Sequence, residues 1–381
     1  MKILFVIDKM KNFAGIERIL TCKMNYIVCQ TSHEVYLTTY EQQSQPLPFP
    51  LESNIFYKPL NIIMPQRSDM TLFQWLKAYR NARNQFKHQF MSLTKGIEPD
   101  IVISTVYSFQ VLDIIINTCH REGIKTIMES HTQGETVTFS YKYKYNRFLY
   151  CLFSFWDCKI MRSLIHCNCV VTLTEQDIPF WQKYAKRIIV IPNMLTITPK
   201  KVIDYEIKRV MSAGRYMFEK GFDMLLEAWY LLPKELNDWH LYIFGNGDRS
   251  IYQEIVDKYN IEGSVHLMPA TNDIADEFSR SSLYVMSSRY EGFGLVLAEA
   301  MSCGLPCVSF DCPYGPREII KDGEDGLLAK YKDVKDLANK MALLMSNTQT
   351  RRNIGEQAIS NIARYEPQTI MNRWIDLFQN L

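Results

Sequence analysis

The stretch Ser287-Ser288-Arg289-Tyr290-Glu291-Gly292-Phe293-Gly294-Leu295-Val296-Leu297-Ala298-Glu299-Ala300-Met301 joins an apolar run, residues 283–286, to a segment with helical spacing. Strand, glycine turn and helix in this order aim free backbone N–H groups and the positive end of a helix dipole at an anion. Two carboxylates, Glu291 and Glu299, flank the turn. Carboxylates repel phosphate but accept hydrogen bonds from vicinal hydroxyl groups. The stretch therefore predicts a ligand with phosphate in its middle and hydroxyls at both ends, as in a nucleotide diphosphate sugar.

The same order of strand, turn and helix recurs along the whole chain. Two successive runs of this kind predict two doubly wound α/β domains, with ligands beyond the carboxyl ends of the strands. The natural site is then a cleft between the domains. In the first half we expect strands at 2–7, 35–39, 101–104, 125–129, 170–174 and 188–191, and helices from 16, at 70–95 and at 111–119. In the second half we expect strands at 209–213, 240–244, 265–268, 283–286, 306–310 and 326–329, helices at 222–230 and 274–279, and a helical end.

Composition indicates a globular protein of 381 residues, with 47% apolar and 22% charged residues. The formal charge of +2 gives no reason to expect a nucleic-acid partner. No apolar run is long enough to span a membrane, and the N-terminus is too short for a signal peptide and predicts a strand instead. Without an export signal, the ten cysteines are expected to be reduced, in a cytoplasmic protein.

Basic residues outnumber acidic ones in the first half of the chain, and the reverse holds in the second half. Residues 141–165 are both aromatic and basic. An amphipathic helix of this composition can lie on an anionic membrane, such as the inner face of the plasma membrane, or can be a core helix whose lysines reach solvent. The sequence leaves both interpretations open.

Metal binding is not expected. His166-Cys167-Asn168-Cys169 contains ligand types, but no second paired cluster has the spacing of a zinc site. The sequence also contains no Asp-x-Asp. We therefore predict activity without a metal ion or another cofactor.

The glutamate pair of the opening stretch, together with Gly214-Arg215 and Glu219-Lys220-Gly221 upstream, resembles glycosyltransferase family 4. Residues 311–318 also resemble a loop of polysaccharide-building members. The resemblance is densest between 210 and 330. It implies retaining transfer and the GT-B fold, in which two Rossmann-like domains face each other. It further implies an acceptor-binding domain at 1–192, a donor-binding domain at 203–364 and a last helix, 365–381, that crosses back to the first domain.

The resemblance assigns the donor contacts residue by residue. Arg215 and Lys220, next to Gly214, would neutralise the donor diphosphate and the charge that develops on it as the glycosidic bond breaks. Glu299 would accept from the ribose hydroxyls, and Glu291 would hold the transferred sugar. The remaining contacts would come from the backbone N–H groups of Phe293, Gly294 and Leu295, from Gly245 and Gly247, and from the backbone around Met268.

Two further contacts would come from the first domain. His131, at a strand end, matches a family histidine near the donor sugar. Gly15 matches part of a glycine loop, but Ala14 stands where members often carry another glycine. A methyl group there limits positive φ and crowds the diphosphate.

The resemblance implies a glycosyltransferase that moves a sugar from a UDP-type donor to a glycan or lipid-linked acceptor in cell-surface polysaccharide biosynthesis. Two alternatives remain. One is a sugar-nucleotide epimerase on the same fold, and the other is a non-catalytic nucleotide-sugar binder.

Overall fold

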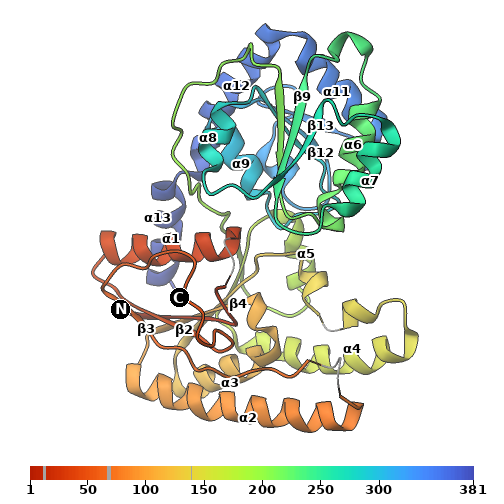
Figure 1. The fold of residues 1–381 in the computed structure, drawn as a ribbon. Helices are drawn as coiled ribbons and strands as arrows, with labels where there is room; N and C mark the ends of the chain where they lie inside the picture. The colour runs from red at the N-terminus through yellow and green to blue at the C-terminus, as the bar shows by residue number, and fades with distance from the viewer. Residues whose placement is uncertain (12–13, 67–69, 139) are drawn as a thin grey trace. The chain divides into compact units, whose positions relative to one another are not determined.

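The computed structural model describes residues 1–11, 14–66, 70–138 and 140–381. The chain divides into two compact units, Met1–Pro192 with Ile370–Leu381, and Asn193–Thr369. Figure 1 draws both units.

The first unit is built on a seven-stranded parallel sheet with the order β3-β2-β1-β4-β5-β6-β7. Its central strands are buried on both faces, as in the run from Ile3 to Ile7, because helices cover both sides. The strands are β1 Lys2–Ile7, β2 Glu34–Thr39, β3 Ile55–Tyr57, β4 Ile101–Thr105, β5 Lys125–Glu129, β6 Cys169–Thr172 and β7 Ile188–Val190.

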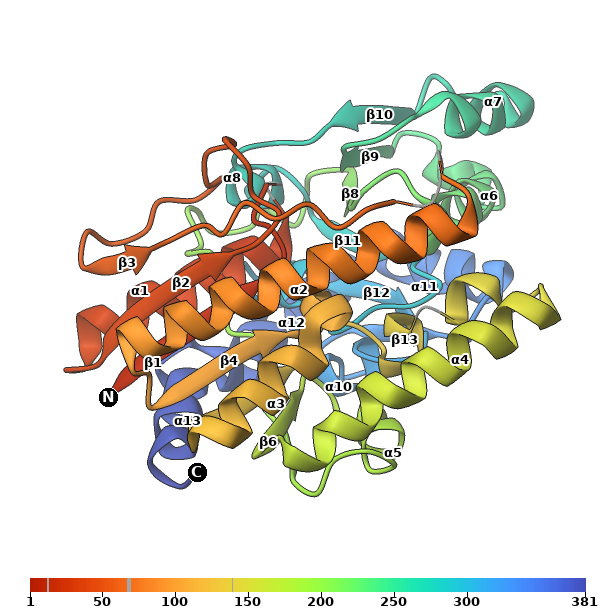
Figure 2. The ribbon, with the colours of Figure 1, turned by 90° about the horizontal axis from the view of Figure 1, so that it is seen from below.

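Helices α2, α3 and α4 cover one face of this sheet, and α1 lies on the other (Figures 1 and 2). Helix α2 begins with a capping box, in which the Thr71 hydroxyl accepts from Gln74 N and the Gln74 side chain accepts from Thr71 N. The helices are α1 Gly15–Gln30, α2 Leu72–Ile97, α3 Leu112–Glu122, α4 Arg147–Arg162 and α5 Ile178–Trp181, and α13 Pro367–Gln379 belongs to this unit from Ile370 onward.

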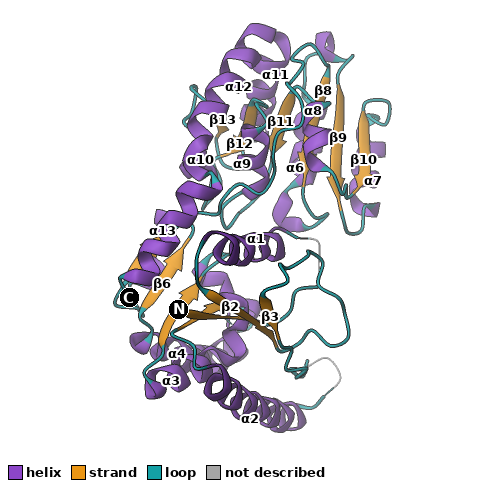
Figure 3. Ribbon diagram, turned by 90° about the vertical axis from the view of Figure 1, so that its left-hand side faces the viewer, coloured by secondary structure: helices purple, strands orange, loops and turns teal. Residues whose placement is uncertain are grey.

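The second unit is built on a six-stranded parallel sheet with the order β10-β9-β8-β11-β12-β13 (Figure 3). Its strands are β8 Arg209–Ala213, β9 His240–Gly245, β10 Val265–Pro269, β11 Leu283–Met286, β12 Cys307–Phe310 and β13 Leu327–Ala329. Its helices are α6 Phe222–Tyr230, α7 Ser250–Tyr259, α8 Ile274–Ser279, α9 Leu295–Ser302, α10 Pro316–Ile319, α11 Val334–Ser346 and α12 Thr348–Ile362. One apolar core joins α6, α7 and α11 to the sheet.

Both sheets confirm the predicted doubly wound α/β class. In each sheet the strand order reverses beside the first strand, between β1 and β4 in one unit and between β8 and β11 in the other. Ligands of such sheets bind outside the carboxyl ends of the strands at this point. Ligand-binding residues are therefore expected in the loops that follow β1, β8 and β11 and in the loops next to these.

Candidate active site

Two predicted donor loops leave the strands that flank the reversal point of the second sheet. Gly214 and Arg215 follow β8, and the turn from Ser287 to Gly294 follows β11. Parallel neighbours end at the same edge of a sheet, so the fold brings together two loops that lie more than 70 residues apart in the chain.

Lys220 and Glu291 meet at this edge. Lys220 Nζ lies 2.7 Å from Glu291 Oε1, and the same oxygen accepts a hydrogen bond of 2.5 Å from Ser288 Oγ. Lys220 reaches this position by passing over Gly214, where a Cβ would lie 3.0 Å from Lys220 Cδ. The ion pair places the group predicted for the phosphates beside the group predicted for the sugar, and these two parts of a nucleotide sugar are bonded to each other.

Arg215 is exposed, and its guanidinium has no hydrogen-bond or ion-pair partner among the described residues. Arg289, by contrast, is fully engaged by its own unit. It donates to both carboxylate oxygens of Asp223, at 2.8 and 2.6 Å, and stacks over Phe218. Arg215 is therefore a cation available to a ligand, whereas Arg289 holds the turn after β11 to the start of α6.

Glu299 lies on α9 and is fully buried. Its Oε1 accepts a hydrogen bond of 2.5 Å from Thr196 Oγ1. Sequence reasoning missed Thr196, because it lies in the segment after β7 and no local pattern indicates a partner 103 residues away. The carboxylate predicted for the ribose is thus held by the segment that enters the second unit.

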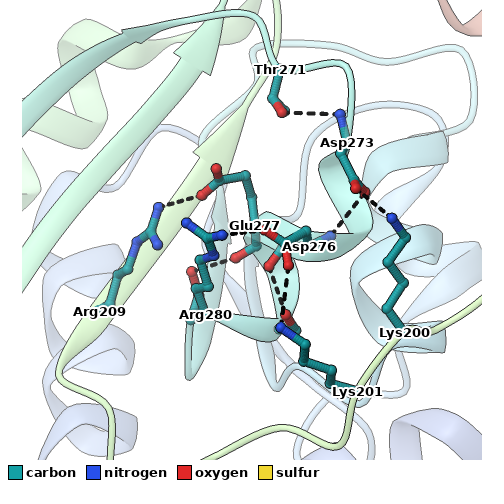
Figure 4. Close-up of polar contacts among 10 residues, drawn as sticks. Lys200, Lys201, Arg209, Thr271, Asp273, Asp276, Glu277 and Arg280 are labelled. Atoms are coloured by element: carbon teal, nitrogen blue, oxygen red, sulfur yellow. Dashed lines mark hydrogen bonds and ion pairs between the residues drawn. The ribbon is translucent and has the colours of Figure 1, made fainter.

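That segment is anchored by a set of ion pairs around α8 (Figure 4). Lys200 pairs with Asp273, and Lys201 Nζ lies 3.5 Å from Asp276 Oδ1. Nearer its start, Leu195 N donates to Tyr365 O at 2.9 Å. Exposed pairs such as these contribute little energy singly, but together they fix the course of the chain on either side of Thr196.

The glycine turn at 292–294 is closed by the loop after β12. Gly294 is the N-cap of α9 with φ +93°, so the N–H groups of Phe293, Gly294 and Leu295 precede the first intrahelical bond. The Phe293 side chain is buried and packs edge-on against Tyr365, with ring centroids 5.3 Å apart. Gly315 has φ +109°, and a Cβ there would lie 2.1 Å from Phe293 O.

We expect Gly315→Ala to lower the free energy of unfolding by about 2–4 kcal/mol, because the methyl group meets backbone in addition to the cost of positive φ. Gly323→Ala is the matched control, since Gly323 has φ +80° and nothing within 4 Å of its Cβ position. It should cost only the conformational part, about 1–2 kcal/mol. Denaturant unfolding of both variants measures the difference, and equal losses would contradict the close approach.

Gly245 and Gly247 are explained by packing within the unit. A Cβ at Gly245 would lie 1.9 Å from Gly214 O, and Gly247 has φ +120° beside Tyr216 O. The Tyr216 hydroxyl lies 2.6 Å from Ile243 O and 3.1 Å from Met268 O. These residues keep the ends of β8, β9 and β10 together, and their contact with a nucleotide stays a prediction.

In the first unit, Gly15 opens α1 at the carboxyl end of β1. Ala14 is the N-cap and has φ −118° and ψ 168°, which is extended backbone open to any residue. The loop therefore does not need positive φ at this position, and the contact of Gly15 with the diphosphate stays a prediction.

His131 follows β5 and is buried, with Nε2 3.4 Å from Glu129 Oε1. Glu129 also accepts a hydrogen bond from Lys23 Nζ on α1. Burial alone would raise the pKa of Glu129, but Lys23 and His131 outweigh it and hold the pKa at about 2. Burial lowers the pKa of Lys23, and the Glu129 charge opposes this change. Sequence reasoning missed Lys23 and Glu129, which read as ordinary helix and strand residues.

The loop that carries His131 is held from the other side by Asp177. Its carboxylate accepts hydrogen bonds from Gly134 N at 3.0 Å and from Trp181 Nε1 at 2.6 Å. Ser130 Oγ lies 3.4 Å from the same carboxylate. His131 therefore stands on a loop fixed at both ends.

The cysteines of the 166–169 stretch are core residues. Cys167 and Cys169 are buried, and burial raises the pKa of the Cys167 thiol to about 12. A protonated thiol is a poor metal ligand. Within the described part of the chain, no group of three or more His, Cys, Asp or Glu side chains could hold a metal ion.

Comparison with known proteins gives the following relatives. The profile of the family described as "Glycosyl transferases group 1" matches residues 195–361. An uncharacterized glycosyltransferase of Haemophilus influenzae is 32% identical over 232 residues, which cover 58% of this chain and 66% of that protein. The amylovoran biosynthesis glycosyltransferase AmsD of Erwinia amylovora is 26% identical over 387 residues, 99% of each chain.

A crystal structure of a mutant of S. aureus TarM, in complex with Fondaparinux, alpha-GlcNAc-glycerol and UDP, has the same fold. The TM-score is 0.75 at 16% sequence identity, and the match covers 99% of both chains. This likeness confirms the predicted GT-B fold class.

Proposed function

Because the chain belongs to the group 1 glycosyl transferases, family 4, we propose that it transfers a sugar from a UDP-sugar to a glycan or lipid-linked acceptor in cell-surface polysaccharide biosynthesis. The observation that carries the proposal is the Lys220–Glu291 pair, with Nζ and Oε1 2.7 Å apart, between the loops that follow β8 and β11. The relative named for amylovoran biosynthesis and the UDP in the TarM complex support the acceptor class and the donor.

In the proposed reaction the bond between the anomeric carbon and the donor phosphate oxygen breaks. A bond from the acceptor oxygen to the same carbon forms on the same face, so configuration is retained, and the acceptor proton passes to a phosphate oxygen. Lys220 and Arg215 stabilise the negative charge that grows on the departing diphosphate. Glu291 accepts from hydroxyls of the sugar, and Glu299 accepts from the ribose. A covalent sugar trapped on any carboxylate would contradict this course.

We expect the protein to hydrolyse one UDP-sugar slowly without an acceptor, and to do so equally well in EDTA. The physical reason is that Arg215 and Lys220 take the charge-neutralising role that a divalent cation fills in other transferases. Incubation with a panel of nucleotide sugars, followed by chromatography, measures this. A changed sugar still bound to UDP would support the epimerase, and binding without turnover would support the non-catalytic binder. Loss of activity on chelation, restored by manganese, would contradict the metal-free mechanism.

We further propose that α2 and α4 of the first unit contact an anionic membrane, where a lipid-linked acceptor would reside. The two helices are neighbours, with the rings of Trp75 and Phe153 6.2 Å apart. Their outward faces carry Phe73 and Phe155, each 79% exposed.

Helix α2 has no acidic residue, and the single acidic residue of α4, Asp157, is buried and accepts from Ser140 N at 2.8 Å. Exposed aromatics among cations suit an anionic interface. Within the described residues, no helix combines the length and apolar character needed to cross a bilayer.

The chain's own thiols can test this surface. Cys151 and Cys158 lie exposed on α4, and Cys29 lies exposed on α1. Vesicles containing phosphatidylglycerol should slow maleimide labelling of Cys151 and Cys158 but not of Cys29. Phe73→Ser with Phe155→Ser should weaken vesicle binding at least about tenfold, since each buried Phe contributes about 1.5–3 kcal/mol. Ile251→Ser on α7, 63% exposed, is the control. Equal protection of Cys29 would contradict the assignment.

A further inference from the structure

A charged pair lies in the interior of the first unit. Lys23 on α1 is 2% exposed and Glu129 at the end of β5 is 1% exposed, and Lys23 Nζ donates to Glu129 Oε1. A buried pair of this kind is often no more stabilising than apolar residues of the same size. Stability alone therefore does not account for it.

The carboxylate of this pair also faces one nitrogen of His131. Nε2 lies 3.4 Å from Glu129 Oε1, within ion-pair distance, and neither Nε2 nor Nδ1 makes a hydrogen bond to the described residues. A carboxylate beside one ring nitrogen selects the tautomer that carries its proton there. The other nitrogen is then left as an acceptor.

Other polar atoms at the same strand ends also lack partners within the described part of the chain. They include Glu129 Oε2, Thr105 Oγ1 and Gln133 Nε2. Thr105 ends β4 and is in register with Glu129 on β5. Buried polar atoms without partners are rare and costly, and the carboxyl ends of parallel strands are where ligands bind. The neighbouring ends of β4 and β5, with Thr105 beside Glu129, are therefore suited to a hydroxyl-bearing group.

The C-terminal helix closes the pair from the other side. Lys23 Nζ lies 3.8 Å from the centroid of the Trp374 ring, and Trp374 is 1% exposed. The aromatic face stabilises the ammonium group and excludes water from it. Lys23 is thus kept beside Glu129, and the charge on Glu129 is kept.

We propose that Lys23 and Glu129 are positioning residues that hold His131 as the Nε2–H tautomer, so that Nδ1 accepts a hydrogen bond from a sugar hydroxyl of the substrate. The identity of the ligand rests on the proposed function. The control of the His131 tautomer by Lys23 and Glu129 does not depend on that function.

The tautomer is tested directly by ¹⁵N NMR of histidine-labelled protein, with His131 assigned from the spectrum of His131→Gln. We expect His131 to be protonated at Nε2 alone in the unaltered protein. In Lys23→Met/Glu129→Leu, an apolar replacement chosen to preserve folding, this preference should be lost. A His131 protonated at Nδ1 in the unaltered protein, or an unchanged tautomer in the double variant, would overturn the inference.

Kinetics test the consequence for the reaction. The double variant should lower kcat for donor hydrolysis by about 10- to 100-fold with little change in KM. The control is Arg83→Met/Asp113→Leu, which removes another ion pair of the same unit, 2.7 Å between Nη2 and Oδ2, and should keep kcat. An unchanged kcat after loss of the tautomer would refute the positioning role. If the unaltered protein cleaves no donor, the proposed function fails, and the NMR result still decides the inference.

Discussion

Replacement of Lys220 by alanine is expected to lower the rate of donor cleavage by about a hundredfold or more, because removal of one preorganised group that stabilises developing charge costs on this order. The side chain is well placed for this role, since Gly214 lets its stem pass and Glu291 fixes its ammonium group at 2.7 Å. The loss should appear in kcat more than in the affinity for UDP, because the charge on the diphosphate grows as the bond breaks.

The same substitution also leaves Glu291 without its cation, and a bare carboxylate would repel phosphate. Lys220→Ala/Glu291→Gln, compared with Glu291→Gln alone because Glu291 itself is proposed to hold the sugar, separates the two effects. If repulsion causes the loss, the double variant is as fast as Glu291→Gln, and we expect it to be much slower. Lys208→Ala is the control, because it removes the exposed pair of Lys208 with Asp238 on the same unit. Near-normal turnover by Lys220→Ala would remove the phosphate role.

The parts of the fold that follow from local pattern were predicted closely. Strands 209–213 and 283–286 and helices 222–230 and 274–279 match β8, β11, α6 and α8 residue for residue. Apolar runs between glycine turns are short-range signals, and a doubly wound sheet follows from their alternation. The short edge strand β3 and helix α7 have no such signal and were not predicted.

The candidate site was predicted only as far as single loops allow. The spacing of residues in the sequence indicates the glycine turn, Arg215 and Lys220, but Lys220 and Glu291 lie 71 positions apart in the chain and meet only through the fold. Thr196 on Glu299 and Lys23 on Glu129 are contacts of the same long-range kind, across 103 and 106 residues. The local sequence around a Thr or a Lys does not indicate a partner so far away in the chain. The residues that hold the predicted ligand-binding side chains in place could therefore not be predicted from the sequence.

Replacement of Lys23 by methionine tests the contact of Lys23 with Glu129, and we expect a large effect on stability. Lys23→Met should lower the free energy of unfolding by about 3–5 kcal/mol, because it leaves the buried Glu129 carboxylate without its opposite charge. Methionine keeps an unbranched apolar side chain of similar length, so little packing is lost. Thermal unfolding measures the loss, and Lys23→Met/Glu129→Leu, which removes both charges, should recover most of it. A single variant as stable as the unaltered protein would contradict the buried pair.

The pH dependence gives this prediction a sign. In the unaltered protein the pKa of Glu129 is held at about 2, below its usual 4.5, so its stabilising effect is present above pH 4.5 and is lost as pH falls toward 2. Without Lys23, only His131 still opposes the effect of burial, and we expect burial to raise the pKa of Glu129 above its value in the unfolded chain. The folded variant then binds the proton of Glu129 more tightly than the unfolded variant does. The variant therefore loses stability as pH rises from the pKa of Glu129 in the unfolded chain toward its higher pKa in the folded variant. The gap in melting temperature between Lys23→Met and the unaltered protein should therefore widen as pH rises above 4.5, the usual pKa of a glutamate, whereas the double variant should show no such widening. A gap that stays constant across this range would mean that Glu129 is not the group left uncompensated.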